Sequence, residues 1–134
     1  MTLQNQFDTF VDAFVDEDLR SDARSHSSVV CAASVGNPVI YVSDTFEAHT
    51  GYRPEEAIGR SLAFLQGPAT EPEAITQFQD LIRSGEAGTI RTTNYRKDKS
   101  SFVHECEMRP IRNADGVITH FIAIQRVVET VGVN

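Results

Sequence analysis

The sequence predicts an α+β fold: one five-stranded antiparallel sheet with helices on one face, plus an N-terminal amphipathic helix. One observation is the alternation of apolar and polar residues at about 87–97, 101–112 and 117–128, which is the period of half-buried strands. Another is a pair of short apolar segments at 29–33 and 39–42, which are also typical of strands. Helical segments lie between the two groups of strands, so the predicted order is helix, two strands, several helices and three strands.

Residues 2–19 have the pattern of an amphipathic helix. Apolar side chains recur on one stripe at helical spacing, and acids and amides occupy the other side. The stripe consists of Leu3, Phe7, Phe10, Val11, Phe14, Val15 and Leu19. Because so short a helix is marginal alone in water, the stripe must pack on the domain's own sheet or on a partner chain. Residues 21–28 (SDARSHSS) are predicted to be a polar linker.

Capping signals define the helices in the middle of the chain. In a capping box, a residue that caps the helix is followed three residues later by a glutamate. Two pairs match this spacing: Asp44 with Glu47, and Thr70 with Glu73. The first predicts a short helix that ends at Gly51, and the second predicts a longer helix that runs to about Arg83. The segment 113–116 (NADG) is a hairpin signal between the last two strands.

Composition narrows the range of functions. The net charge of −7 argues against non-specific binding to nucleic acid or to an anionic membrane. No segment approaches the ~18 apolar residues of a membrane span, and the first residues lack the features of a signal peptide. Cys31 and Cys106 have neither metal-ligand spacing nor a dense disulfide pattern. We therefore expect a cytoplasmic protein without nucleic-acid, membrane or metal partners.

Several stretches, in this order along the chain, resemble the PAS superfamily and, within it, the light-oxygen-voltage (LOV) photoreceptor domains. They are NPVIYVSDTFEAHTGY (37–52), IGRSLAFLQGPAT (58–70), NYRKDKSSF (94–102) and RPIRNADGVITHFIAIQ (109–125). The resemblance covers about Val29 to Thr130. It implies a flavin held between the sheet and the helices, which in LOV domains forms a light-driven bond with a cysteine sulfur.

The LOV motif around that cysteine is only partly present. The family motif reads Gly-x-Asn-Cys-Arg-Phe-Leu-Gln, and the matching positions are Gly59, Phe64, Leu65 and Gln66. Ser61 replaces the asparagine that binds the ribityl chain, and Leu62 replaces the photoactive cysteine. Ala63 replaces an arginine that pairs with the flavin phosphate, and by spacing Gln79 takes the place of a second one. The resemblance thus implies a pocket without the adduct-forming thiol.

The contacts to the polar edge of the flavin ring are better kept. Asn94 matches the first asparagine that reads this edge, and His104 replaces the second. Gln125 matches the glutamine near flavin N5 and O4 that usually relays the light signal. Strand alternation places His104 and Cys106 on the pocket side of one strand. Cys106 is interpreted, like Cys31, as a small pocket-lining residue and not as an adduct former.

The bound flavin is left open between riboflavin and FMN. Since Ala63 and Gln79 cannot pair with a phosphate, FMN loses two charge-assisted contacts, each worth about 1.5–3 kcal/mol. Arg60 and Arg83 lie nearby in sequence, but each is better explained as a solvated helix residue.

These residues favour a cysteine-less LOV-like sensory domain that binds riboflavin or FMN. Without the thiol, an excited flavin can still take up an electron and then a proton at N5, and Gln125 would sense that proton. Photoreduction or redox sensing is therefore the expected mode of action. The alternative is a PAS protein-interaction module with an empty or altered pocket, and a small ligand other than a flavin is a further possibility. An enzyme is not expected, because the four histidines show no nucleophile or metal arrangement.

The predicted organisation is an N-terminal helix (1–20), a linker (21–28), a LOV-like PAS domain (29–130) and a short tail (131–134). We expect a homodimer that uses the N-terminal helix and the outer face of the sheet, where the 122–128 region leaves apolar side chains. A helix folded back on its own sheet in a monomer is the alternative. The downstream signalling partner is expected to be a separate protein.

Overall fold

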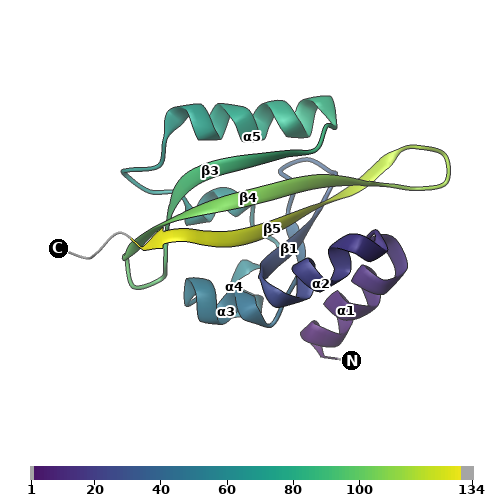
Figure 1. Cartoon of the computed structure of the whole chain (residues 1–134), viewed down its shortest axis with the longest axis horizontal. Helices are drawn as coiled ribbons and strands as arrows, with labels where there is room; N and C mark the ends of the chain where they lie inside the picture. Colours follow the sequence, from purple (N-terminus) through teal and green to yellow (C-terminus); the bar gives the residue numbers. More distant parts are fainter. Residues whose placement is uncertain (1, 131–134) are drawn as a thin grey trace.

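The computed structural model describes residues 2–130, which form one antiparallel sheet with helices on both faces (Figure 1). The strands are β1 (Ser27–Ala32), β2 (Val39–Val42), β3 (Gly88–Tyr95), β4 (Ser101–Arg112) and β5 (Ile118–Thr130). Their order across the sheet is β2-β1-β5-β4-β3, so the last strand of the chain lies at the centre of the sheet. The predicted α+β class and five-stranded antiparallel sheet are confirmed.

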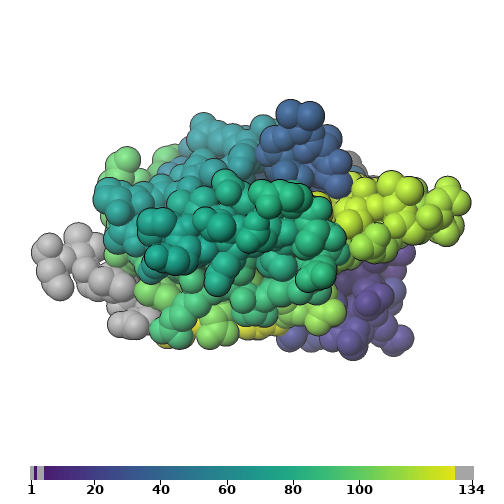
Figure 2. Space-filling view, turned by 90° about the horizontal axis from the view of Figure 1, so that it is seen from above, coloured from purple at the N-terminus to yellow at the C-terminus, as the bar shows by residue number. Residues whose placement is uncertain are grey.

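One face of the sheet, called the inner face, is covered by the helices in the middle of the chain. They are α3 (Thr45–Thr50), α4 (Pro54–Ala57), the 3-10 helix η1 (Leu62–Leu65) and α5 (Pro72–Ser84). Figure 2 looks onto α5 (teal), beyond which the β4–β5 hairpin projects to one side. Apolar residues of these helices form one core cluster with Val29, Met108, Phe121 and Ala123 of the sheet.

Two predicted capping boxes are wrong, although both helices form. Asp44 lies at the start of α3 with helical backbone angles and makes no side-chain cap, because a cap residue needs an extended backbone. The residue before α5 is Glu71, and Thr70 instead accepts from Gly67 N (2.9 Å) and donates to the carbonyl of Thr93 (2.6 Å). The threonine that was predicted to cap a helix therefore fastens a loop to the edge strand β3. The glycine stop is confirmed, since Gly51 ends α3 in the left-handed conformation.

The single helix predicted over 2–19 is wrong. Two helices are present, α1 (Leu3–Phe14) and α2 (Glu17–Ser25), joined by an extended turn at Val15 and Asp16. A straight helix over 2–19 would be about 27 Å long. The turn brings Leu19 and Ala23 of α2 into the same buried cluster as the α1 residues. The linker predicted over 21–28 is wrong for the same reason, because it is the end of α2 and the start of β1.

The two N-terminal helices cover part of the outer face of the sheet (Figure 1). Phe7 and Val11 are fully buried there against Val30, Ile122 and Ile124. Among the stripe residues from Phe7 to Leu19, Phe14 is the exception, because its side chain is 61% exposed. The stripe is thus used within the chain, and the Ile122 to Ile124 region that was expected to lie open is covered. Among residues 2–130, no helix is long and apolar enough to span a membrane.

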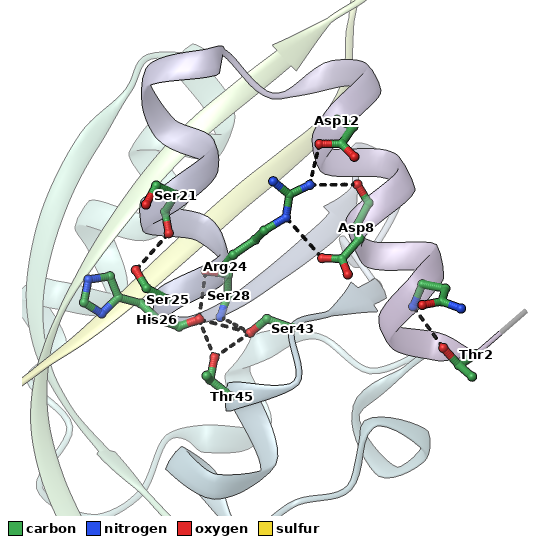
Figure 3. A network of polar contacts seen from close by, with 11 residues as sticks. Thr2, Asp8, Asp12, Ser21, Arg24, Ser25, His26, Ser28, Ser43 and Thr45 are labelled. Atoms are coloured by element: carbon green, nitrogen blue, oxygen red, sulfur yellow. Dashed lines mark hydrogen bonds and ion pairs between the residues drawn. The ribbon is translucent and has the colours of Figure 1, made fainter.

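Polar contacts fasten α2 to its neighbours. Arg24 pairs with Asp8 (3.3 Å) and Asp12 of α1 (Figure 3). At the end of α2, the carbonyl of His26 accepts from the hydroxyls of Ser43 (3.1 Å) and Thr45. Since α2 has few apolar residues of its own, these contacts explain how so polar a helix is held in place.

We predict that Phe7→Ala lowers the free energy of unfolding by about 3–5 kcal/mol, because it opens a cavity beneath α1. Phe14→Ala is the matched control on the same helix and should change this free energy by less than about 0.5 kcal/mol. Chemical denaturation of both variants measures the two values. Equal losses in the two variants would show that α1 does not pack as described.

Candidate ligand-binding cavity

A cavity of about 340 Å³ lies between the inner face of the sheet and the helices η1 and α5, a size typical of small-molecule sites. Its wall is formed by Cys31, Gly36, Asn37, Ser61, Leu62, Ala63, Gln66, Ile75, Phe78, Gln79, Ile82, Thr92, Asn94, His104, Cys106, Met108, Phe121 and Gln125. None of these residues carries a formal charge when histidine is neutral. The cavity therefore suits a neutral ligand better than an ionic one.

The sheet side of the wall follows from strand alternation. Every second residue of β4 faces inward, which brings His104, Cys106 and Met108 to the cavity. The register then sets their neighbours: His104 lies opposite Thr92 of β3, and Cys106 lies opposite Gln125 of β5. Donors and acceptors are thus grouped on three adjacent strands.

The helical side of the wall is mainly apolar. Ile75, Phe78 and Ile82 lie at helical spacing on one face of α5, and Leu62 faces them from η1. Ser61 caps η1, because its hydroxyl accepts from the backbone N–H of Ala63 (3.2 Å). A flat apolar ring would find hydrophobic contacts on this side and polar groups on the sheet side.

Asn94 and His104 form the central polar contact of the sheet wall. Asn94 Nδ2 lies 3.0 Å from His104 Nε2. An amide nitrogen can only donate, so Nε2 accepts and the ring proton lies on Nδ1. Burial, and less strongly the charge of His49, lowers the pKa of His104 to about 4, which keeps the ring neutral at pH 7. His104 therefore offers one N–H donor, Nδ1, which has no partner.

Gln125 connects the cavity to the N-terminal helices. Its Oε1 accepts from the hydroxyl of Ser27 (3.1 Å), and both side chains are buried. Ser27 is the first residue of β1 and directly follows His26, the C-cap of α2. The neighbouring Arg126, on the other face of β5, pairs with Asp22 of α2 at 3.0 Å. Two adjacent residues of β5 thus contact the α2 region. Gln125 does so through Ser27, at the junction of α2 and β1, and Arg126 does so through its ion pair with Asp22.

The two cysteines both line the cavity and are protonated at neutral pH. Burial raises the pKa of Cys31 to about 12. Burial, to which the neighbouring Cys31 adds, raises the pKa of Cys106 to about 12 as well. Because the thiolate is the nucleophile, neither sulfur is activated for bond formation.

All seven residues expected from the sequence line this one cavity: Ser61, Leu62, Gln66, Asn94, His104, Cys106 and Gln125. Their roles toward a ligand stay predictions. The sequence analysis did not identify Thr92 as a wall residue. Its position two residues before Asn94 on β3 places both side chains on one face of the sheet and would have indicated it. It also missed Phe78, Ile82 and Phe121 as wall residues. Within the described residues, no group of three metal-ligating side chains could hold a metal ion.

Comparison with known proteins identifies the family. The PAS domain model matches residues 26–126. The chain is 38% identical over 90 residues to Protein TWIN LOV 1 of Arabidopsis thaliana, which covers 66% of this chain and 23% of that protein. It is also 38% identical over 94 residues to the Blue-light photoreceptor of Listeria monocytogenes, which covers 70% of this chain and 37% of that protein. The chain thus spans well under half the length of these relatives.

Solved structures agree with this assignment. The structure described as "Flavin Analogue Sheds Light on Light-Oxygen-Voltage Domain Mechanism" superimposes with a TM-score of 0.78 at 31% identity, over 85% of this chain and 87% of that one. The chain belongs to the PAS domain family, and its fold is that of the light-oxygen-voltage domains.

Proposed function

We propose that this chain is a sensory domain that binds a flavin, riboflavin or FMN, in the cavity and responds to its redox state. The observation that carries the proposal is a cavity with apolar walls, neutral amide and imidazole groups at one side, and no charged residue in its lining. The relatives' names, which include a blue-light photoreceptor, support a sensory role over a catalytic one. A cytosolic location, expected from the two unpaired cysteines, is part of the proposal.

The residues fit a flavin ring on chemical grounds. Leu62, Phe78 and Ile82 supply apolar contacts for the ring faces, and Asn94, His104 and Gln125 supply donors and acceptors for its polar edge. The unpartnered Nδ1–H of His104 is a buried donor that a ring carbonyl would satisfy. When bound, a flavin supplies absorption of visible light and one-electron chemistry.

The surroundings of the cavity offer little to a phosphate. Arg60 is outside the lining and lies over the ring of Phe64, 5.6 Å from its centroid. Arg83 is also outside the lining, and its exposed side chain pairs with Asp80 at 3.1 Å. A phosphate dianion would therefore gain no built-in charge partner, which supports binding of riboflavin about as tightly as FMN.

Signalling through a thiol is disfavoured by the cavity's chemistry. Leu62 occupies the position of the family's cysteine by resemblance, and it lines the cavity without a sulfur. Cys31 and Cys106 lie on the sheet side and stay protonated, because burial raises the pKa of each to about 12. We infer that a change of redox state, not a cysteinyl adduct, is the event that Gln125 senses.

The path from Gln125 outward is short. A change in the hydrogen bonding of Gln125 alters its bond with Ser27, and Ser27 lies at the junction of α2 and β1. The ion pair of Arg126 with Asp22 ties the same helix to β5. The α1–α2 pair is therefore the output element that this proposal assigns.

A second candidate function is a PAS protein-interaction module, and the observation that favours it is the exposed Phe14 at the end of α1. Together with the exposed Val127 and Val128 of β5, this residue is what remains of the expected homodimer interface. Phe10, its ring partner at 5.0 Å, is buried in the chain's own core. The packing within the chain thus still allows a homodimer through the Phe14 side of α1.

We predict that riboflavin and FMN bind with dissociation constants within about tenfold of each other, a difference of about 1.4 kcal/mol. The reason is the lack of a cation in the cavity lining. Calorimetry with the apo protein measures both constants. Ala63→Arg is the matched variant, and it should favour FMN by about 10–100-fold by supplying one charge-assisted contact. A hundredfold preference for FMN in the wild type would contradict the prediction.

Blue light should leave both thiols of the flavin-loaded wild type intact, because Leu62 carries no sulfur and the two cysteines are not activated. The infrared S–H stretching bands, recorded in the dark and under illumination, measure this directly. Leu62→Cys adds a thiol on the η1 side of the cavity, and illumination should remove one S–H band in this variant. Reversible loss of a band in the wild type would show that Cys31 or Cys106 reacts.

Light scattering tests the proposed dimer. The wild type is expected to be a dimer, and Phe14→Asp is expected to be a monomer that keeps its fold by circular dichroism, since Phe14 is 61% exposed within the chain. Phe10→Asp is unsuitable for this test, because it would place a charge in the core. A wild type that stays monomeric at high concentration would rule the dimer out.

A further inference from the structure

The helix α5 forms one wall of the cavity but is weakly anchored. It has 13 residues, and of these only Ala74 is buried. Its apolar side chains Ile75, Phe78 and Ile82 are half-buried and line the cavity. Segments with few buried apolar contacts are the ones that open locally in folded proteins. Among the walls of the cavity, α5 is therefore a candidate for movement.

The other walls are held more firmly. The sheet side consists of strands that are hydrogen-bonded to their neighbours. The 3-10 helix η1 is anchored by Leu65, which is fully buried. The turn between β1 and β2 is closed by Asn37, whose side-chain amide donates to the carbonyl of Ala32 (3.1 Å). A wider opening of the cavity would thus come from α5, which lies on the outside of the molecule along β3 (Figure 1).

The start of α5 is fastened to β3, an edge strand of the sheet. The carboxylate of Glu71 accepts from the N–H and the hydroxyl of Thr93, each at 2.8 Å. The hydroxyl of Thr70 donates to the carbonyl of the same threonine (2.6 Å). The N–H of Ala69 donates to the hydroxyl of Tyr95 (2.9 Å). These four contacts, called the clasp, hold the beginning of the helix against the edge of the sheet.

Glu71 is the charged member of the clasp. Burial raises the pKa of its carboxyl, but the hydrogen bonds from Thr93 outweigh this effect and lower the pKa below its ordinary value. The group is therefore ionised at neutral pH, and its bonds to Thr93 are charge-assisted, which makes them stronger than bonds between neutral groups. Glu71 is not part of the cavity lining, so these bonds act on the position of α5 and not on a ligand.

The other end of α5 has the features of a hinge. Gly85 ends the helix in the left-handed conformation (φ 71°), and the exposed Glu86 and Ala87 lead to Gly88 at the start of β3. The carbonyl of Gly85 accepts from Arg112 Nη2 (3.3 Å), which keeps the pivot in place. Hinges are a few residues at the ends of elements that absorb a large change of backbone angles, which glycine permits.

We propose that α5 is a lid that turns about residues 85–88, and that a ligand enters and leaves the cavity when the clasp at Glu71 opens. Glu71 is thus a positioning residue, which sets how often the lid opens without touching the ligand. The inference rests on the proposed function only for the identity of the ligand, because the weak anchoring, the clasp and the hinge belong to the chain itself.

Stopped-flow fluorescence with riboflavin measures the rate constants of association and dissociation. Glu71→Ala should raise both by about 10–100-fold and leave Kd within about twofold, because the clasp loses two charge-assisted bonds while the cavity lining is unchanged. Thr93→Val removes one of these bonds and should raise both rate constants by about tenfold. Glu73→Ala is the matched control, since it removes an exposed carboxylate from the first turn of the same helix. It should change neither rate constant by more than about twofold.

Labelling of the two native thiols tests the lid without a flavin. Cys31 and Cys106 are buried but line the cavity, so an aromatic disulfide reagent reaches them only after the cavity opens. In the ligand-free wild type, the labelling rate should depend little on low concentrations of denaturant, because a local opening exposes little surface. Glu71→Ala should speed labelling by the same factor as riboflavin release, and Glu73→Ala should not.

A labelling rate that depends on denaturant as steeply as global unfolding does would overturn the lid. A weaker Kd at an unchanged association rate in Glu71→Ala would also overturn it, since that is the result expected of a residue that only supports the cavity wall. Thr93→Val gives the same readouts if Glu71→Ala does not fold. If the wild type bound no riboflavin, the proposed function would fail, and the labelling rates alone would decide whether α5 is a lid.

Discussion

The structure depends on the burial of both faces of one strand. β5 is central in the sheet, and its successive residues alternate between two cores. Ile122 and Ile124 pack beneath α1 and α2, while Phe121 and Ala123 belong to the inner core. A register shift of one residue would exchange the two sets and place Gln125 outside the cavity. The position of every sheet-side cavity residue therefore follows from this register.

The same alternation explains why the cavity and the N-terminal helices are connected. Gln125 faces inward and contacts Ser27, and Arg126 faces outward and contacts Asp22. Arg126 also pairs with Glu107 of β4 at 3.1 Å, so the outward contact is braced on a second strand. The proposed coupling between the cavity and the helix pair needs no long pathway, because adjacent residues of one strand contact both.

Local sequence patterns correctly predicted the structural features that depend on the spacing of neighbouring residues. Strand alternation placed His104 and Cys106 on the cavity side, and the glycine after α3 ended that helix as expected. The break at Asp16 was not predicted, because the apolar stripe runs past it without losing its helical period. Only tertiary packing decides that Leu19 and Ala23 return to the sheet. Similarly, the sequence predicted that Thr70 caps a helix. Its hydroxyl instead donates to the carbonyl of Thr93, which is distant in sequence.

The cavity departs from the stability rules that the rest of the chain follows. Most buried polar groups are paired, as Thr93 is with Glu71 and Gln125 is with Ser27. In the wall, His104 leaves Nδ1 unpaired although the residue is 1% exposed. A protein that needed only a stable core would place apolar side chains there, since replacing such groups is often neutral or stabilising. A conflict between local stability and residue choice in the cavity wall is what a binding role would explain and a packing role would not.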